Sequence, residues 1–232
     1  MHEPRRSEAP IGRRVVIGLL GLGAAGVVLG PPVANGVDEA LKSAGGAGFI
    51  PGTDDFQLYT VTDGFPAPPP DYHLTVNGLV ERPLSLTVED LRAMPATRMV
   101  KPFQCVTGWR VPGVHWTGVQ LAHLLDLAGP RPSGMALRFW SFDRVYTESL
   151  TLSQARRPDV IVAYDMLGGP VPRAHGGPVR LYVAPMYGYK SIKWLSRISV
   201  VGEVIPGYWE QYGYAVNAWV GDSNGRHDAP ID

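Results

Sequence analysis

The chain has 232 residues and carries 21 basic and 21 acidic side chains, so no long-range field favours nucleic acid or an acidic surface. Apolar residues make up 45% of the chain, which excludes a disordered protein, while its 50 Gly and Pro residues indicate many loops. The single cysteine excludes an internal disulfide, and it cannot complete a four-ligand structural zinc site without three nearby histidines.

Residues 1–34 have the layout of an export signal or membrane anchor. Arg13-Arg14 directly precede an apolar run from Val15 to Gly30, which Pro31-Pro32 ends. An arginine pair in this place is typical of the twin-arginine type of signal. The run is shorter than the roughly 20 residues of a usual membrane span. No small-x-small cleavage site follows it, so an uncleaved anchor with a cytoplasmic N-terminus stays open.

The same run contains a G-x-G-x-x-G pattern between Gly21 and Gly26, which occurs in dinucleotide-binding folds. Such a fold needs a helix of several turns and then a second strand that ends in an acidic residue. Pro31-Pro32 ends the helix almost at once, and no strand pattern follows before Asp38. The sequence therefore disfavours a nucleotide site here.

Residues 35–55 are small and polar and indicate a flexible linker, so we expect the globular domain to span residues 56–232. Alternating apolar residues and capping signals predict the following elements in this domain. In chain order, they are strands at 73–76 and 84–87, a helix at 88–93 capped by Thr87, a helix capped by Thr117 and ended by Gly129-Pro130, paired strands at 136–141 and 145–150, a short helix opened by Thr151-x-x-Gln154, and buried strands at 160–164 and 179–184. Because no strand alternates with a long helix, the predicted class is α+β with strands dominant.

Cys105 lies in the segment Phe103-Gln104-Cys105-Val106-Thr107-Gly108-Trp109-Arg110. Free cysteine is among the most buried residue types, so a buried apolar thiol is one interpretation. An apolar, extended run precedes the cysteine and a Thr-Gly turn follows it, which predicts a sulfur at the end of a strand. Loops at strand ends are where a rigid scaffold places chemistry. The residues alone leave both interpretations open.

This segment, with Trp116-Thr117-Gly118 after it, resembles the metal-binding segment of the sulfite oxidase family of molybdopterin enzymes. Further signatures of that family follow in order, and together they cover roughly residues 56–221. They are Ala163-Tyr164, His175-Gly176-Gly177-Pro178-Val179-Arg180-Leu181, Gly188-Tyr189-Lys190-Ser191-Ile192-Lys193-Trp194-Leu195 and Gly207-Tyr208-Trp209-Glu210. The resemblance implies a sulfite oxidase-like molybdopterin-binding fold and a molybdenum–molybdopterin cofactor. It also implies that Cys105 is the metal ligand, a role that suits a soft thiolate.

The resemblance implies roles for other residues as well. Tyr164 matches the active-site tyrosine of the family, 11 positions before His175. The cofactor carries a phosphate, which favours fixed cations and hydroxyl donors. The positions expected to bind the cofactor are Tyr59, Thr60, Ser141, His175, Arg180, Lys190, Ser191, Ile192 and Lys193. Each of these residues also has an ordinary structural interpretation, such as a solvated face for the two lysines.

Two departures from the family pattern concern the substrate. Sulfite-oxidising members carry an arginine near the substrate oxyanion, and the alignment of the following proline-rich turn places Thr62 there. They also have an Asn-Arg-Arg run after the cysteine, where this chain has Gly108-Trp109-Arg110. Loss of one substrate arginine removes a charge-assisted pair worth about 1.5–3 kcal/mol. The pattern therefore keeps the metal site and disfavours sulfite.

The predicted function is a molybdenum-dependent oxidoreductase that transfers an oxygen atom to or from a small substrate. The alternatives are a sulfoxide reductase, as in the periplasmic methionine sulfoxide reductase branch of the same superfamily, and a non-catalytic member of the fold. A serine hydrolase, suggested by G-x-S-x-G at residues 221–225, is disfavoured because no suitable acid and histidine follow.

The chain has no Cys-x-x-Cys-His motif, so we expect a separate electron carrier, membrane-bound or soluble. A pterin held by residues far apart in sequence can bind only to the folded domain. Export of a loaded enzyme therefore needs a route that carries folded cargo, which the twin-arginine signal provides. We expect an extracytoplasmic bacterial enzyme that contacts the membrane through its N-terminal segment.

Overall fold

The computed structural model describes residues 56–62 and 64–222. The expected signal or anchor at residues 1–34 and the expected linker at residues 35–55 lie outside the described residues. Within the described ranges, no helix is both long and apolar enough to span a bilayer.

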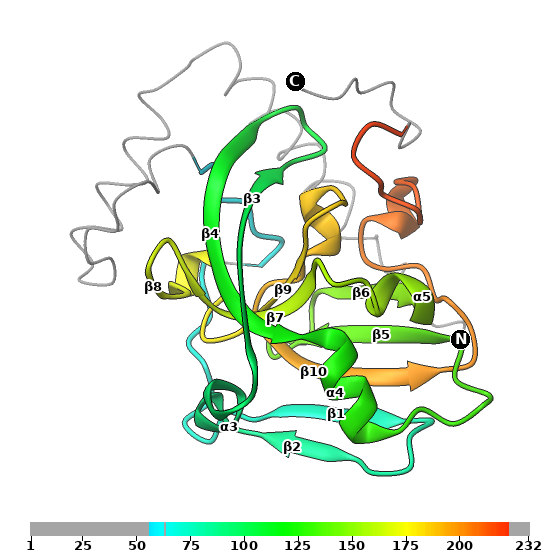
Figure 1. The fold of residues 1–232 in the computed structure, drawn as a ribbon. Helices are drawn as coiled ribbons and strands as arrows, with labels where there is room; N and C mark the ends of the chain where they lie inside the picture. The colour runs from blue at the N-terminus through cyan, green and yellow to red at the C-terminus, as the bar shows by residue number, and fades with distance from the viewer. Residues whose placement is uncertain (1–55, 63, 223–232) are drawn as a thin grey trace, which may run out of the picture. The chain divides into compact units, whose positions relative to one another are not determined.

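The first of two sheets is five-stranded within the described residues, with the strand order β2-β1-β10-β5-β6 (Figure 1). The strands β1 and β10 are parallel, with Thr75 opposite Arg197, although they come from the two ends of the described chain. The other neighbours in this sheet are antiparallel. Its strands are β1 (Leu74–Gly78), β2 (Leu84–Leu86), β5 (Ala136–Ser141), β6 (Thr147–Thr151) and β10 (Leu195–Val201).

The second sheet is antiparallel, with the order β3-β4-β7-β8 and with β9 also paired to β7. Its strands are β3 (Ala96–Gln104), β4 (Arg110–Gln120), β7 (Val160–Met166), β8 (Gly169–Pro170) and β9 (Arg180–Val183). The strands β3 and β4 form a long hairpin that bends over the rest of the unit (Figure 1). Gln104 pairs with Arg110 at the tip of this hairpin, so Cys105 lies in its connecting turn.

Two short helices confirm the predicted capping signals. Helix α3 (Val88–Ala93) begins with a capping box in which the side chain of Thr87 accepts a hydrogen bond from the Asp90 N–H. Helix α5 (Leu152–Ala155) begins with the same arrangement between Thr151 and Gln154. The 3-10 helices are η1 (Arg173–His175), η2 (Gly188–Lys190) and η3 (Glu210–Tyr212).

The prediction that Thr117 caps a helix is wrong. Thr117 lies within β4, and helix α4 (Leu121–Ala128) begins after Gln120, whose side chain makes no capping hydrogen bond. The register of β4 against β7 shifts between Thr117 and Gly118, and a Cβ on Gly118 would lie 2.7 Å from the Cα of Ala163. The glycine therefore permits a close strand approach rather than a helix start. The predicted end of the helix is confirmed, because Gly129 adopts a left-handed conformation with φ 68°.

Strand β7 lies between two apolar clusters and is buried on both faces, as its continuous apolar sequence predicted. Val160 and Val162 belong to the larger cluster, which joins both sheets and α4. Ile161 and Ala163 belong to the smaller cluster, which also contains Trp116 of β4 and Tyr182 of β9. The class is α+β with strands dominant, as predicted.

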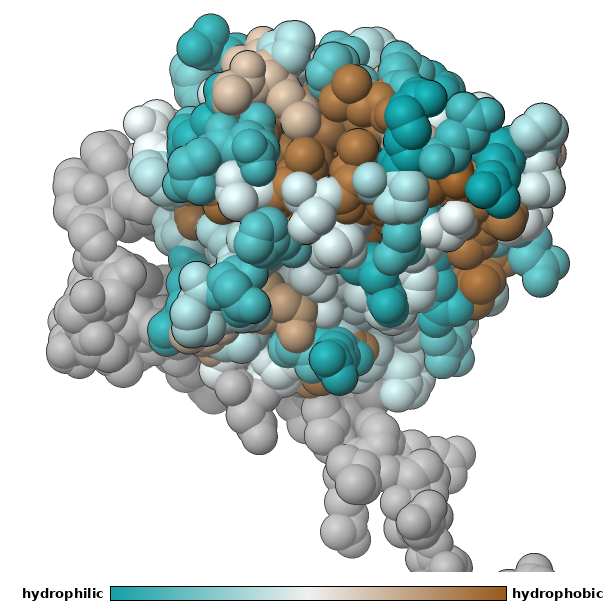
Figure 2. All heavy atoms as spheres, turned by 90° about the horizontal axis from the view of Figure 1, so that it is seen from below, coloured by the Kyte–Doolittle hydropathy of each residue, from teal (hydrophilic) through white to brown (hydrophobic). Residues whose placement is uncertain are grey.

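The larger cluster also reaches the surface, since Leu79, Leu84 and Val88 pack against it while only partly buried. Figure 2 shows the side that faces downward in Figure 1, where apolar side chains form an area among polar ones. The smaller cluster is covered by partly buried aromatic side chains, including Phe56, Phe103 and Trp109. These aromatic residues surround the turn that contains the cysteine.

Candidate functional site

The turn after β3 holds the only cysteine of the chain. The Cys105 N–H donates to the carbonyl oxygen of Trp109 at 2.9 Å, and the Gly108 N–H donates to the Cys105 oxygen at 3.1 Å. Gly108 has φ 105°, a conformation that L side chains rarely adopt, so the turn requires glycine there. The Thr107 hydroxyl donates to Cys105 Sγ at 3.2 Å. The sulfur is thus fixed at the end of a strand, as the sequence predicted.

The environment of the thiol favours its protonated form. Burial raises the pKa of the Cys105 thiol, and the hydrogen bond from the Thr107 side chain only partly offsets this effect. A thiolate is the form that binds metals, so a positive charge next to the sulfur would be needed to stabilise it. The arrangement suits a ligand that becomes a thiolate when a metal ion binds, rather than a nucleophile that is already ionised.

Aromatic rings connect this turn to the beginning of the described chain. Phe103 and Trp109 stack with ring centroids 5.7 Å apart, and Tyr59 also stacks on Trp109, with ring centroids 6.2 Å apart. Phe56 contacts the His175 ring edge-on, with centroids 4.9 Å apart. The segment around Tyr59, the cysteine turn and η1 therefore lie together, although they are far apart in sequence.

Arg180 is the buried centre of a group of cationic side chains. It is 2% exposed, and its Nη1 and Nη2 donate to the carbonyl oxygens of His175 at 2.7 Å and Ser191 at 2.8 Å. Its guanidinium carbon lies 5.3 Å from the centroid of the Phe103 ring and 5.5 Å from that of Trp116. One side chain thus fixes η1, the segment after η2 and the strand that leads to the cysteine.

Lys193 joins the same group. Its Nζ donates to the carbonyl oxygens of Ala174 at 2.8 Å and Tyr59 at 2.9 Å. Within the described residues, neither Lys193 nor Arg180 forms an ion pair with a carboxylate. The two cations therefore face carbonyl dipoles rather than a neutralising charge.

The cationic groups are held in an environment that opposes their charge. Burial, with a smaller contribution from Arg180, lowers the pKa of Lys193 to about 7, although its side chain is only partly shielded from solvent. Burial also lowers the pKa of Arg180 to about 10. Burial, Lys193 and Arg180 together lower the pKa of His175 to about 3, so its imidazole is neutral at pH 7. An anion bound here would relieve this repulsion.

Glycines bring the backbone close to these side chains. Gly176 has φ 104°, and a Cβ on it would lie 2.7 Å from the Cβ of Lys193. A Cβ on Gly188 would collide with the ring of Phe103. The loop at residues 175–177, the segment after η2 and the cysteine hairpin are therefore packed at distances that only glycine allows.

Several buried donors near the cysteine lack an acceptor. Gln104, which is 5% exposed, has no partner for its Nε2 among the described residues, and the indole N–H of Trp109 has none either. Within the same residues, the indole N–H of Trp116 also lacks a hydrogen bond of normal geometry, but this ring stacks on Tyr182. The Trp109 indole lies close enough to lower the pKa of the Cys105 thiol slightly, without a hydrogen bond of normal geometry. Unpaired buried donors are rare and costly, so this region fits a ligand rich in acceptor oxygens.

The other expected cofactor residues lie nearby but are engaged in local bonds. Ser191 Oγ accepts from the Val183 N–H at 3.0 Å, and the carbonyl of Ile192 accepts from the Leu181 N–H. Ser141 Oγ accepts from the Tyr146 N–H at 3.1 Å, in a turn whose Phe142 N–H donates to the Trp194 carbonyl. Thr60 Oγ1 accepts from the Thr62 N–H at 3.1 Å. These residues shape the loops of the site, and their direct contacts with a ligand stay predictions.

Tyr164 follows Ala163, which pairs with Arg180 in β9, but its side chain has a different partner from the other expected site residues. Its ring is buried under the guanidinium of Arg92, whose carbon is 4.5 Å from the ring centroid. Arg92 also forms a bidentate pair with Asp165. Within the described part of the chain, no hydrogen bond, ion pair or ring contact joins the Tyr164 side chain to Cys105, Arg180 or Lys193.

The structure corrects the expectation for Lys190. This lysine is fully buried, and its Nζ contacts Glu148 Oε1 at 2.6 Å and also Glu210 Oε1. Two carboxylates therefore neutralise the charge that was expected to face a cofactor phosphate. The only signals of these partners in the sequence are Glu148, within the predicted strand at residues 145–150, and Glu210, and neither segment indicates that its side chain reaches Lys190.

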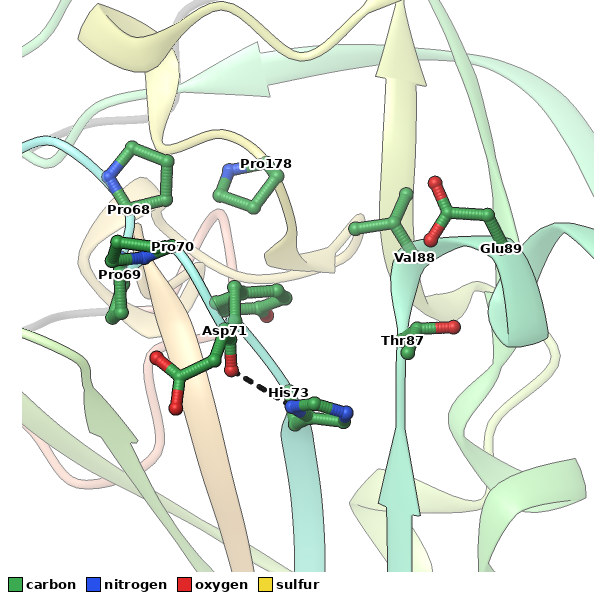
Figure 3. A pocket seen from close by; sticks show the side chains of 10 residues that line it. Pro68, Pro69, Pro70, Asp71, His73, Thr87, Val88, Glu89 and Pro178 are labelled. Atoms are coloured by element: carbon green, nitrogen blue, oxygen red, sulfur yellow. Dashed lines mark hydrogen bonds between the residues drawn. The ribbon is translucent and has the colours of Figure 1, made fainter.

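A shallow groove lies elsewhere on the surface, between a proline-rich segment and the start of α3 (Figure 3). None of the residues of the cysteine turn or of the cationic group lines it. Its lining residues are Pro68, Pro69, Pro70, Asp71, Tyr72, His73, Thr87, Val88, Glu89 and Pro178. This groove is therefore separate from the cysteine turn and from the cationic group.

Comparison with known proteins gives a family match. Residues 63–209 match a family described as "Oxidoreductase molybdopterin binding domain". The chain is 32% identical over 177 residues to a sulfite oxidase of Arabidopsis thaliana, covering 62% of this chain and 45% of that protein. It is 31% identical over 171 residues to the protein-methionine-sulfoxide reductase catalytic subunit MsrP of Gluconobacter oxydans, covering 64% of this chain and 54% of that protein.

Two further similarities complete the comparison. The chain is 32% identical over 143 residues to the uncharacterized oxidoreductase YuiH of Bacillus subtilis, covering 62% of this chain and 72% of that protein. The crystal structure of the sulfane dehydrogenase SoxCD from Paracoccus pantotrophus is similar with a TM-score of 0.55 and 29% identity. That match covers 60% of this chain and 40% of the other, so the chain spans less than two thirds of the dehydrogenase, the plant oxidase and the reductase.

Proposed function

Because the chain belongs to the family of oxidoreductases with a molybdopterin-binding domain, we propose that it is a molybdenum-dependent enzyme that transfers an oxygen atom to or from a small substrate. The resemblance to the sulfite oxidase family, predicted from the sequence, is confirmed by the family match and the relatives. The strand-dominated fold expected of that family is confirmed by the similarity to SoxCD.

The observation that carries the proposal is the group of Arg180, Lys193 and His175, packed beside the cysteine turn. These residues fit molybdopterin, because burial lowers the pKa values of Lys193 and Arg180 and thus disfavours their charged forms. The phosphate of the cofactor would supply an anion that stabilises these charges. The unpaired donors of Gln104 and Trp109 fit its oxygen atoms. Cys105 would supply the soft thiolate ligand to molybdenum.

The residues of the chain have distinct tasks in this proposal. Cys105 would hold the metal as a thiolate, and the Thr107 hydroxyl, which donates to its sulfur, would orient it. Lys193, with a pKa of about 7 in the protein alone, gains a full positive charge when the phosphate lies beside it. Arg180 acts mainly by its charge and by holding the carbonyls of His175 and Ser191. The bound cofactor supplies the redox chemistry of oxygen-atom transfer.

Reduction of a neutral sulfoxide is the second candidate reaction. It takes two electrons and two protons and releases a thioether and water, whereas sulfite oxidation takes water and releases sulfate, two electrons and two protons. Thr62 stands where sulfite-oxidising relatives are expected to carry an arginine. Within the described residues, its hydroxyl forms only local hydrogen bonds, at 3.1 Å to Thr60 Oγ1 and 3.3 Å to the Gly64 carbonyl. A neutral substrate does not need the missing charge.

The wider setting of the enzyme is part of the same proposal. We propose that residues 1–34 act as a twin-arginine signal or anchor, that residues 35–55 link this segment to the domain, and that residues 56–232 make up the cofactor-binding domain. The domain lies outside the cytoplasm, tethered to the membrane through its N-terminal segment. A separate electron carrier, membrane-bound or soluble, exchanges electrons with the cofactor.

The experiment that tests the function is a substrate panel on protein expressed with molybdate and purified with its pterin. Reduced and oxidised dyes serve as electron donors and acceptors for sulfoxides and sulfite, respectively. Turnover of either substrate class that disappears in Cys105→Ser supports the proposal. A protein that contains neither molybdenum nor pterin supports the alternative of a non-catalytic member of the fold. A loaded protein that turns over none of these substrates contradicts the two proposed substrate classes.

A further inference from the structure

Lys190, Glu148 and Glu210 form a buried ionic group next to the candidate cofactor site. All three side chains of this Glu148–Lys190–Glu210 clamp are fully buried. Lys190 comes from η2, Glu148 from β6 and Glu210 from η3, so the clamp joins three separate elements. A buried ion pair contributes little net stability compared with apolar residues, but loss of one partner leaves an uncompensated buried charge. Such a group is better suited to fixing one arrangement than to stabilising the fold.

The hydrogen bonds of the clamp define its geometry. Glu148 Oε1 accepts from Lys190 and from the Ser149 N–H at 2.8 Å, while Glu210 Oε2 accepts from the Gly207 N–H at 2.5 Å. A Cβ on Gly207 would lie 2.6 Å from Glu148 Oε1, so only glycine lets residues 207–210 approach this closely. The clamp therefore fastens the segment after β10 directly to η2.

The charges of the clamp balance only if one carboxyl group keeps a proton. Burial, with an added contribution from Glu210, raises the pKa of Glu148 to about 8, although Lys190 acts in the opposite direction. Glu148 Oε2 is buried without a partner among the described residues. The other ionisable groups around Glu148 are the phenols of Tyr146, Tyr189 and Tyr208, and burial raises the pKa of Tyr146 and of Tyr208 above the ordinary value. Two carboxyl groups, one ammonium and one retained proton give a neutral cluster.

The position of the clamp in the chain relates it to the cofactor. Lys190 directly precedes Ser191, Ile192 and Lys193, three positions expected to bind the cofactor, of which Lys193 is proposed to lie beside its phosphate. A second bond supports the same place, because the Tyr146 hydroxyl donates to the Tyr189 carbonyl at 2.7 Å. The end of η2 is thus fixed by the side chain of Lys190 and by the backbone carbonyl of Tyr189.

We propose that Glu148, Lys190 and Glu210 are positioning residues that hold the segment Ser191–Lys193 in its cofactor-binding conformation, so that docking of residues 207–210 controls retention of the pterin. This inference rests on the proposed function of that segment. The clamp itself does not contact the cofactor. It acts through the backbone that it shares with Ser191 and Lys193.

The test measures how fast the full-length, cofactor-loaded protein releases pterin, detected by fluorescence of the oxidised free pterin. Lys190→Met keeps an unbranched side chain but removes the ammonium, and Glu210→Gln removes one carboxylate while keeping its shape. We expect both variants to release pterin about 10- to 100-fold faster than the wild type, the range found for residues that orient ligands indirectly. If Lys190→Met fails to fold, Glu210→Gln alone decides.

Leu124→Ala is the matched control, because Leu124 is fully buried in α4, outside the clamp. Its rate of pterin release is measured at the temperature at which its unfolded fraction equals that of the clamp variants. Slow release from Leu124→Ala and fast release from the clamp variants support the inference. Equal release rates from all of them overturn it, since the clamp would then act only on global stability. A wild type that contains no pterin contradicts the proposed function instead.

The pH dependence of release gives a signature that a purely structural role does not produce. Release from the wild type should accelerate as the pH rises through about 8, because Glu148 then loses its proton and leaves a net negative charge in the clamp. The Glu148→Gln variant has no titrating carboxyl group at this position, so the acceleration of release near pH 8 should disappear. Any dependence of the release rate on the titration of Lys193 and Cys105 should stay. The same profile in both proteins would overturn the inference.

Discussion

Lys193 Nζ donates a hydrogen bond of 2.9 Å to the carbonyl oxygen of Tyr59, a residue 134 positions earlier in the chain. The same ammonium donates to the Ala174 carbonyl at 2.8 Å, next to His175. The ammonium of Lys193 therefore links the beginning of the described domain, at Tyr59, to the loop that carries His175. Lys193 thus has both a charge for the ligand and a structural link around it.

Lys193→Glu should give protein that lacks the cofactor. The change places a negative charge beside the phosphate and removes charge-assisted hydrogen bonds worth about 1.5–3 kcal/mol, equivalent to at least a tenfold loss of pterin affinity. Pterin content of the purified variant is the measurement. Lys101→Glu, at an exposed position of β3, is the control and should keep the wild-type content. Full pterin content in Lys193→Glu would mean that this lysine is only a structural link between Tyr59 and Ala174.

Cys105→Ser should abolish turnover and change the paramagnetic signal of molybdenum, because a hard oxygen replaces the soft sulfur ligand. Thr107→Val removes the hydroxyl that bonds to the sulfur but leaves the ligand in place, so its signal should shift less and some activity should survive. Electron paramagnetic resonance of both variants separates the two effects. Turnover by Cys105→Ser at the rate of the wild type would contradict the assignment of Cys105 as the metal ligand.

The cofactor-free protein should lose stability as the pH falls from about 6.5 to about 3. In this window His175 takes up a proton in the unfolded chain but not in the folded protein, where its pKa is lowered to about 3. The expected loss is on the order of 2–4 kcal/mol across the window. Urea unfolding at several pH values measures it. His175→Gln should flatten this dependence, while His115→Gln, at an exposed position, should keep it; an unchanged slope in His175→Gln speaks against the buried neutral imidazole.

Local signals in the sequence predicted much of the fold. Thr87 and Thr151 cap the expected helices because each forms its capping box with a side chain three residues later. Gly129 ends α4 because its conformation needs no Cβ. The helix start failed for a tertiary reason: Thr117 has the chemistry of a cap, but pairing with β7 keeps it in a strand.

Long-range features of the site were less accessible to sequence reasoning. Strand β10, at 195–201, was not predicted, since its parallel pairing with β1 depends on residues more than a hundred positions away. Cys105 was correctly expected at a strand end because the flanking pattern is local. The family resemblance assigned Lys190 to the cofactor, and the sequence around this lysine does not indicate which side chains contact it in the folded protein. The carboxylates of Glu148 and Glu210 reach it from two other parts of the chain.

The wild-type protein should oxidise sulfite slowly or not at all, because Thr62 replaces the arginine expected near a substrate oxyanion. Turnover should be compared between sulfite and a neutral sulfoxide in the same metal-replete preparation. Thr62→Arg should raise the ratio of sulfite oxidation to sulfoxide reduction about tenfold or more, in line with one charge-assisted contact. Sulfite turnover by the wild type at the rate of its best sulfoxide would refute this account of specificity.

Replacement of Arg13 and Arg14 by lysines should retain metal-loaded protein in the cytoplasm, because the twin-arginine route depends on this pair. Fractionation of cells followed by metal analysis measures the distribution. Replacement of Arg5 and Arg6 by lysines makes the same substitution outside the motif and should leave export normal. Normal export of the Arg13 and Arg14 variant with molybdenum bound would exclude the twin-arginine interpretation.

The ratio of molybdenum to protein in the purified full-length chain tests the central claim most directly. The protein is expressed with molybdate in a host that makes molybdopterin, and a known molybdopterin enzyme expressed in parallel controls for cofactor supply. The account predicts about one molybdenum per chain, accompanied by one pterin, as a single Cys105 ligand requires. A loaded control enzyme beside a chain that contains neither molybdenum nor pterin would contradict it.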